Sequence, residues 1–240
     1  QKGKSRSPHW QKLLIAEDAR VRQYEDVVWI DSDVLINFYD TPFVVTSHIN
    51  KEKIGVVSIK ETNSLPERKK NREERFYQYI NKYGEERRRG VNTIADLYKN
   101  AGLVDVIVDD YFNAGVMVFS PTNHAHILRQ VYDMYEENQK TAYENYPLCY
   151  HLFKNDHVDF IDRRFNTIWP HEVMEHYPFI QAFHDNEERV RKEIPCYEDI
   201  IRFCVNTTWH NSFFLHLIND RGMEKHMQLI DQNNSSPFAF

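Results

Sequence analysis

An apolar run that ends at two aspartates constrains the fold of this chain more than any other stretch. Residues 27–33 read V-V-W-I-D-S-D, and the apolar residues V-L-I follow directly. Side chains two positions apart in a strand point to the same side, so Asp31 and Asp33 repel each other unless a cation lies between them. The pattern predicts a buried strand with a site for Mg²⁺ or Mn²⁺ at its carboxyl end. An aspartate pair that only caps a turn is the alternative.

Short apolar runs alternate with helical patterns along the 240 residues. Charged residues with aromatic residues at helical spacing predict a helical insertion over 66–100, which forms a lid or an acceptor wall. Strands that alternate with helices predict an α/β fold with a mixed, mainly parallel sheet flanked by helices, in a single domain over 1–240. Strands are expected at 24–30, 54–59, 104–108, 116–119, 158–161 and 178–183, and helices at 10–22, after Ser120 and at 147–154.

Charge, hydropathy and cysteine usage bear on the partners and the cellular compartment of the protein. The net charge of -6 gives no general attraction to nucleic acid. No apolar stretch reaches the roughly 20 residues that span a bilayer, so no transmembrane segment is expected. The 3 cysteines lack metal-binding spacing and indicate reduced thiols in a cytoplasmic protein. The alternative is the lumenal catalytic domain of a secretory-pathway enzyme whose anchor has been removed, and the oligomeric state stays open.

Three segments resemble GT-A fold glycosyltransferases, which use nucleotide-sugar donors. Residues 27–36 are similar to their D-x-D segment. Y-F-N-A-G-V-M-V-F at 111–119 and R-F-N-T-I-W at 164–169 are similar to two segments of glycosyltransferase family eight, which includes glycogenin and bacterial lipopolysaccharide galactosyltransferases. The resemblance implies a GT-A-like fold. It also implies transfer of a glucose, galactose or xylose type sugar from a UDP-sugar to a hydroxyl group of a glycan or glycoprotein acceptor.

The resemblance assigns the metal site residue by residue. Asp31 and Asp33 match the metal-binding pair, and Asp31 with the intervening Ser32 also lies near the donor. In these families a late histidine completes the metal shell and contacts the diphosphate. His184 is the first candidate for that histidine, and His210 is the second.

The resemblance also assigns residues to the donor. Asn113, Ala114 and Gly115 match the segment that lines the donor sugar, and glycine permits a close approach of the backbone. Arg164 and Asn166 belong to the R-F-N segment and are expected to bind the donor as well.

The chain departs from the family pattern in three places. The family's H-x-x-G-x-x-K-P-W is replaced by H-D-N-E-E-R-V-R-K at 184–192, where Arg191 or Lys192 stands in for the phosphate-binding lysine. The family's D-Q motif is replaced by a segment that begins at Glu144. Only 30 residues precede Asp31, so the N-terminal part of the nucleotide-binding half is expected to be shortened or missing, and the base-binding residues stay unassigned.

Sugar transfer with inversion needs a carboxylate base beside the acceptor hydroxyl. Glu144, Asp110 and Asp109 are the candidates, whereas retention, as in family eight, does not need that base. Two other classes remain open. A metal-dependent nucleotide-sugar phosphohydrolase or nucleotidyltransferase would turn over a UDP-sugar without an acceptor. An inactive module would bind a glycan or a nucleotide and turn over neither.

Overall fold

A computed structural model gives the structure of the protein, and it describes residues 6–38, 50–60, 74, 77–78, 81, 90–136, 143–180, 186–218 and 227–230. Contacts within the chain divide it into two units. The first unit consists of Gln1–Ile30, Val44–Asn63 and Tyr77–Asp162, and the second of Asp31–Phe43, Ser64–Phe76 and Arg163–Phe240.

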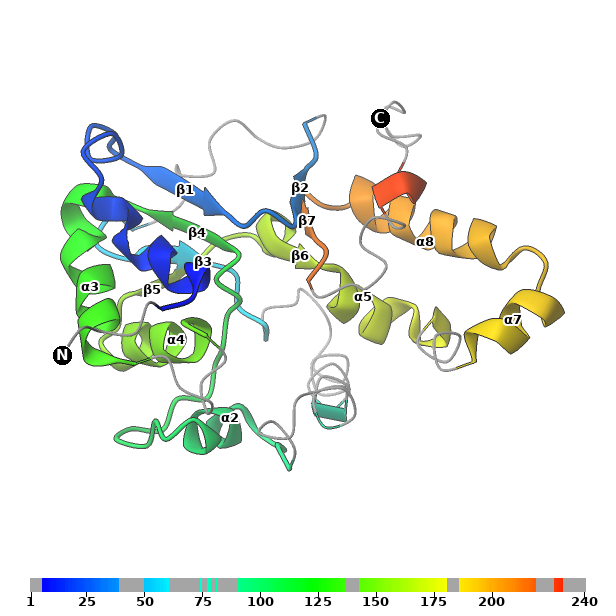
Figure 1. Ribbon diagram of the computed structural model, residues 1–240, viewed down its shortest axis with the longest axis horizontal. Helices are drawn as coiled ribbons and strands as arrows, with labels where there is room; N and C mark the ends of the chain where they lie inside the picture. Colours follow the sequence, from blue (N-terminus) through cyan, green and yellow to red (C-terminus); the bar gives the residue numbers. More distant parts are fainter. Residues whose placement is uncertain are drawn as a thin grey trace. The chain divides into compact units, whose positions relative to one another are not determined.

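The first unit is built on a four-stranded sheet (Figure 1). Its strands are β1 (Val27–Ile30), β4 (Val116–Phe119), β3 (Ile54–Val56) and β5 (Val158–Phe160), in that spatial order. All of β4 is buried, as expected for a continuous apolar run with strands on both edges and both faces covered. Ile30 pairs with Val116. The strand that leads to Asp31 and the strand that follows Gly115 therefore lie side by side.

Helices cover this sheet. They are the 3₁₀ helix η1 (Pro8–Glu17), α2 (Ile94–Asn100), α3 (Pro121–Met134) and α4 (Asn145–Lys154). The helix η1 packs against α3, and its Trp10 and Leu13 are fully buried, as are Leu128 and Val131 of α3. Proline at the start of both helices fixes the backbone where an amide hydrogen would have no partner.

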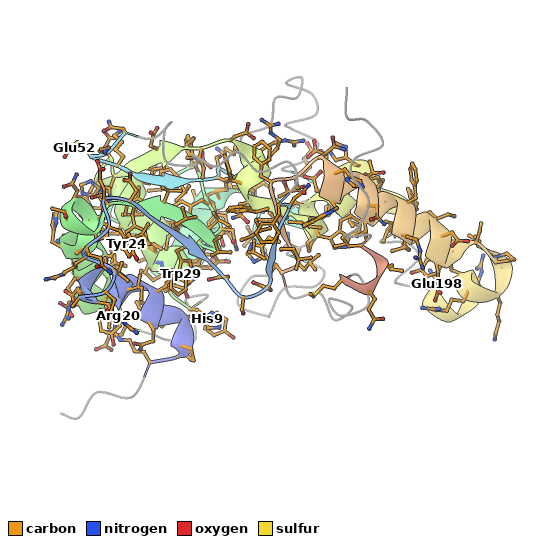
Figure 2. All side chains as sticks on the ribbon, turned by 90° about the horizontal axis from the view of Figure 1, so that it is seen from above. His9, Arg20, Tyr24, Trp29, Glu52 and Glu198 are labelled. Carbon is orange, nitrogen blue, oxygen red and sulfur yellow. The ribbon has the colours of Figure 1, made fainter. Side chains whose placement is uncertain are left out.

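The second unit is built on a three-stranded sheet. Its strands are β2 (Val34–Ile36), β7 (Phe214–His216) and β6 (Thr167–Ile168), in that order. Around it lie the 3₁₀ helix η4 (Arg163–Asn166) and the helices α5 (Trp169–His176), α7 (Glu187–Glu193) and α8 (Tyr197–His210). Glu198, which Figure 2 labels, lies in the first turn of α8. Trp169, Val205 and Trp209 pack with Leu215 and Leu217 in the core of this unit.

The mixed α/β fold with helices beside the sheets is confirmed, but the expectation of mainly parallel strands was wrong. Among the described strands, β3 with β5 and β6 with β7 are parallel, whereas β1 with β4, β3 with β4 and β2 with β7 are antiparallel. The alternation of strands and helices suggested parallel crossovers. Instead, β1 and β2 enter different sheets, and β4 returns between β1 and β3.

Two expected strands are absent where the structure describes them. Residues 104–108 form no strand: Ile107 is 90% exposed, and the Val106 amide donates to the Tyr150 hydroxyl at 2.8 Å. Residues 178–180 are helical, and 181–183 lie outside the described residues. The helix expected at 10–22 is a 3₁₀ helix that ends at Glu17.

The expected insertion over 66–100 falls mostly outside the described residues, which include α2 at its end. That the chain forms a single domain, and that its N-terminal part is shortened, stay predictions. All three cysteines are free of disulfides. In the part of the chain that the structure describes, no helix has both the length and the apolar character to cross a membrane.

Candidate functional site

Asp31, Asp33 and His216 form a group in the second unit in which one ligand atom from each lies within 4.8 Å of the others. The aspartates lie in the turn before β2, where the Asp31 carbonyl accepts a hydrogen bond from the Val34 amide at 3.2 Å. His216 ends β7 and pairs with Val34 in the antiparallel register. The Leu217 amide donates to the Asp33 carbonyl at 3.0 Å, which holds the turn against the end of β7. Strand pairing therefore brings together residues that are far apart in sequence.

The neighbours of the His216 ring set its chemistry. The ring is buried, and its Nδ1 lies 2.9 Å from Oδ1 of the buried Asn166. An amide oxygen only accepts hydrogen bonds, so this contact favours the proton on Nδ1. The lone pair of Nε2 then faces Asp33, whose Oδ1 lies 3.1 Å away. Two lone pairs at that distance require a proton or a cation between them.

The donor set fits a small divalent cation. Asp31 and Asp33 are half-buried and offer carboxylate oxygens, and His216 offers an imidazole nitrogen. Oxygen ligands with one imidazole suit Mn²⁺ or Mg²⁺. Asn166 would orient the ligating ring, as hydrogen-bond partners of metal-bound histidines do. Asp31 and Asp33 thus lie together with His216, which the sequence analysis did not name, and the metal site itself stays a prediction.

A second group, Glu172, Glu175 and His176, also has ligand atoms within 4.8 Å of one another among the described residues. All three come from α5. Side chains on adjacent turns of one helix lie close together whether or not they bind a metal. The group also lies outside the three segments that resemble glycosyltransferases.

The R-F-N segment lies next to His216. Asn166 contacts the His216 ring, as described above, so its amide acts on the histidine. Arg164 is exposed, and its guanidinium lies 4.2 Å from the ring centroid of Phe213. Its carbonyl accepts from the Phe213 amide at 2.8 Å, which ties η4 to the start of β7.

The Y-F-N-A-G loop of the first unit has its backbone fixed at several points. Asn113 Oδ1 accepts from the Gly115 amide at 2.8 Å, which closes a tight turn. The Ala114 amide donates to Asn145 Oδ1 at 2.8 Å, and the Ala114 carbonyl accepts from Lys12 Nζ at 3.2 Å. Lys12 Nζ also lies 5.6 Å from the ring centroid of Trp29, which Figure 2 labels. Side chains of η1 and α4 therefore hold this loop.

Glu144 is the most buried of the three predicted catalytic carboxylates. Its Oε1 lies 3.0 Å from Lys12 Nζ, and the two side chains are only 4% and 3% exposed. Burial raises the pKa of Glu144, although the Lys12 ammonium opposes this. A carboxylate enclosed with an internal lysine is poorly suited to take a proton from an acceptor, and the catalytic role of Glu144 stays a prediction that its burial does not favour.

Asp110 and Asp109 differ strongly in exposure. Both Asp110 carboxylate oxygens lie 3.0 Å from the Ser58 hydroxyl, and the Tyr111 amide donates to Oδ1 at 2.7 Å. Burial raises the pKa of Asp110 despite these bonds. Asp109 is 88% exposed, with its Oδ2 3.6 Å from Lys60 Nζ. Asp110 is therefore the less exposed of the two, and the catalytic role of either residue stays a prediction.

The other predicted residues lie elsewhere or outside the described residues. His184 is outside them. His210 ends α8 and is not part of the Asp31 group. Lys192 is exposed on α7, and the neighbouring Arg191 donates to Glu198 Oε1 at 2.6 Å. Ser32 is exposed in the turn between the two aspartates.

The sequence analysis missed His216, Lys12 and Asn145. The available signal for His216 was a histidine inside the apolar run F-F-L-H-L at 213–217, because a polar ring in a buried strand needs a partner. No comparable pattern marked Lys12, which reads as one more polar residue of an N-terminal helix. Asn145 directly follows Glu144, and the sequence analysis considered only the carboxylate of that segment.

Comparison with known proteins gives two structural likenesses. No family model matches the sequence, and no curated protein matches it. A glycosyltransferase involved in the glycosylation of the major capsid of PBCV-1 aligns with a TM-score of 0.49 and 13% identity over 95% of this chain and 80% of its own. The bifunctional glycosyltransferase WbbM, in its apo structure, aligns with a TM-score of 0.45 and 13% identity over 98% of this chain and 37% of its own. At these scores neither likeness determines what this protein does, and membership of family eight stays a prediction.

Proposed function

We propose that this chain is a metal-dependent glycosyltransferase that moves a sugar from a UDP-sugar to a hydroxyl group of a glycan or glycoprotein acceptor. The observation that carries the proposal is the group of Asp31, Asp33 and His216 at the ends of paired strands. Three segments that resemble GT-A glycosyltransferases support it: the D-x-D turn and the two segments similar to family eight.

In this proposal the chain's own side chains hold the cation and orient the donor. Asp31, Asp33 and Nε2 of His216 bind Mn²⁺ or Mg²⁺, and Asn166 keeps the His216 ring in the ligating tautomer. His216 takes the role assigned from sequence to His184 or His210. When bound, the ion supplies positive charge that stabilises the departing diphosphate.

The remaining donor contacts follow from the resemblance. Asn113, Ala114 and Gly115 line the donor sugar in this proposal, because they match the family's donor-lining segment. Ser32 lies beside the donor. In the proposal the exposed cations Arg164 and Lys192 bind its phosphates.

If the transfer inverts the anomeric carbon, Asp110 is the best of the three carboxylates to take the proton of the acceptor hydroxyl. Its raised pKa brings it closer to the range of a general base, and Asp109 is the alternative. Retention would leave Asp110 with a binding role only.

A thermal-shift measurement with and without Mn²⁺ tests the proposal. UDP is expected to stabilise the protein only when Mn²⁺ is present, because the ion connects the carboxylates to the diphosphate. Asp33→Ala and His216→Ala are expected to abolish the shift. His210→Ala is the matched control, because His210 lies outside the group and the shift should persist.

A shift with UDP that is equally large without metal would overturn the proposal. Turnover then separates the classes. A glycosyltransferase releases UDP faster when an acceptor is added, a phosphohydrolase or nucleotidyltransferase works at full rate without one, and an inactive module shows binding but no turnover.

A further inference from the structure

The Asn145 side chain makes more contacts to the Y-F-N-A-G loop than to its own helix. Its Oδ1 accepts from the Ala114 amide at 2.8 Å. Its Nδ2 lies 3.0 Å from the Phe112 carbonyl and 2.6 Å from the Tyr111 hydroxyl, and it donates to these acceptors. One amide thus binds both peptide groups that flank Asn113.

The helix that carries Asn145 is packed into the core of the first unit. Asn145 is the first residue of α4, and the Leu148, Cys149 and Leu152 side chains of that helix are fully buried. The Cys149 thiol also lies 3.1 Å from the Phe112 carbonyl. A side-chain amide has a fixed planar arrangement of donors and acceptor, so it can hold a loop in one backbone conformation.

We propose that Asn145 is a positioning residue that sets the conformation of residues 112–115 and so determines how tightly the sugar part of the donor is held. This inference rests on the proposed function, which assigns the loop to the donor sugar. It predicts that Asn145 acts on sugar binding and not on the diphosphate or the cation, since its described contacts are to the loop and α4.

The test compares the affinities for UDP and for the UDP-sugar that binds the wild-type protein most tightly among UDP-glucose, UDP-galactose and UDP-xylose, all with Mn²⁺. In Asn145→Leu the UDP-sugar affinity is expected to fall about tenfold, and the UDP affinity to change by less than about twofold. A loss that reflected only general damage to the fold would weaken both ligands alike. The ratio of the two affinities is therefore the readout.

Two further variants keep the test decisive. Asn155→Leu is the matched control, because Asn155 lies at the other end of α4 and its amide donates to the His151 carbonyl, away from the loop. It should leave the ratio unchanged. Tyr111→Phe removes only the hydroxyl group that Asn145 contacts. It should lower the affinity for the UDP-sugar relative to that for UDP, as Asn145→Leu does. This variant provides the test if Asn145→Leu fails to fold.

The outcomes separate this inference from the proposed function. If wild-type protein binds UDP only with Mn²⁺ but the ratio is unchanged in Asn145→Leu and in Tyr111→Phe, the role of Asn145 is overturned and the proposed function stands. If wild-type protein shows no metal-dependent binding of UDP, both are overturned.

Discussion

The two nitrogens of His216 meet different partners, and this gives Asn166 a measurable role. Loss of the Asn166 amide oxygen would leave the buried Nδ1 without its acceptor and free the ring to change tautomer. The position of the proton, and with it the availability of Nε2, thus depends on a residue that would not contact the ion.

We therefore expect Asn166→Leu to weaken Mn²⁺ binding by about 10–100-fold, the usual cost of removing a partner that orients a metal ligand. Isothermal titration with Mn²⁺ measures this. Asn211→Leu is the control in the same unit, because the Asn211 amide donates to the Thr207 carbonyl at the end of α8. An unchanged affinity in Asn166→Leu would show that Asn166 does not orient the ligand.

His124 makes the stability of the protein depend on pH. The ring is fully buried at the start of α3, and its Nδ1 accepts from the Ser120 amide at 2.9 Å. Protonated Nδ1 could not accept this bond. Burial lowers the pKa of His124 below 6.5, and it lowers those of His151 and His157 in the same direction.

When the pKa of a histidine is lower in the folded state than in the unfolded chain, its contribution to stability is fully present above the unfolded pKa of 6.5. Below that value the unfolded chain binds more protons, so the free energy of unfolding should fall as the pH decreases through the lowered pKa values. Urea denaturation at about pH 7.5 and about pH 5.5 measures this, and His124→Asn should reduce the pH dependence. If the free energy of unfolding of His124→Asn depends on pH as strongly as that of the wild type, the dependence comes from other groups.

At the scale of elements, the ion pair of Lys12 and Glu144 joins η1 to the start of α4. Lys12→Met is expected to lower the free energy of unfolding by about 3–5 kcal/mol, because it leaves a buried carboxylate without its cation. The double variant with Glu144→Leu should recover much of that loss. Urea denaturation measures both.

Lys53→Met provides the control for this pair. Lys53 Nζ lies 2.7 Å from Asp156 Oδ1, but the Asp156 side chain is 88% exposed, so its loss should change stability little. A Lys12→Met protein as stable as the wild type would mean that water or another cation compensates Glu144.

Sequence patterns located the elements whose residues form an unbroken apolar run or follow a clear start signal. The half-buried strand β1 and the buried strand β4 follow from continuous apolar runs, and the start of the helix α3 follows from the proline after Ser120. The run around Val104 and Ile107 has the composition of a strand and yet is exposed. Composition records a preference, whereas a strand also needs a neighbouring edge with which to pair.

The candidate site was predictable in part for a related reason. Asp31 and Asp33 are close in sequence, so local spacing placed them together. His216 reaches them only through the pairing of β2 with β7, and Lys12 reaches Glu144 only through packing of the first unit. Such contacts depend on which strands pair and in which direction, and the alternation of helices and strands suggested the wrong direction for β1 with β4, β3 with β4 and β2 with β7.

At the scale of the whole molecule, two sheets divide the strands between two units, and the passage from β1 to β2 is the short segment Asp31–Asp33. The three residues of the candidate metal site come from widely separated parts of the chain. The three segments that resemble GT-A glycosyltransferases are spread over both units, and the single domain expected from the sequence stays a prediction.

The contact between Asp33 and His216 spans 183 residues of chain. An ion held there would act as a reversible staple that closes a very long loop, and closing a long loop removes much freedom from the unfolded chain. Depleting the ion would then do more than stop chemistry. It would also loosen the attachment of β7 to the turn before β2, so that in this proposal one ion would both stabilise the second unit and take part in the reaction.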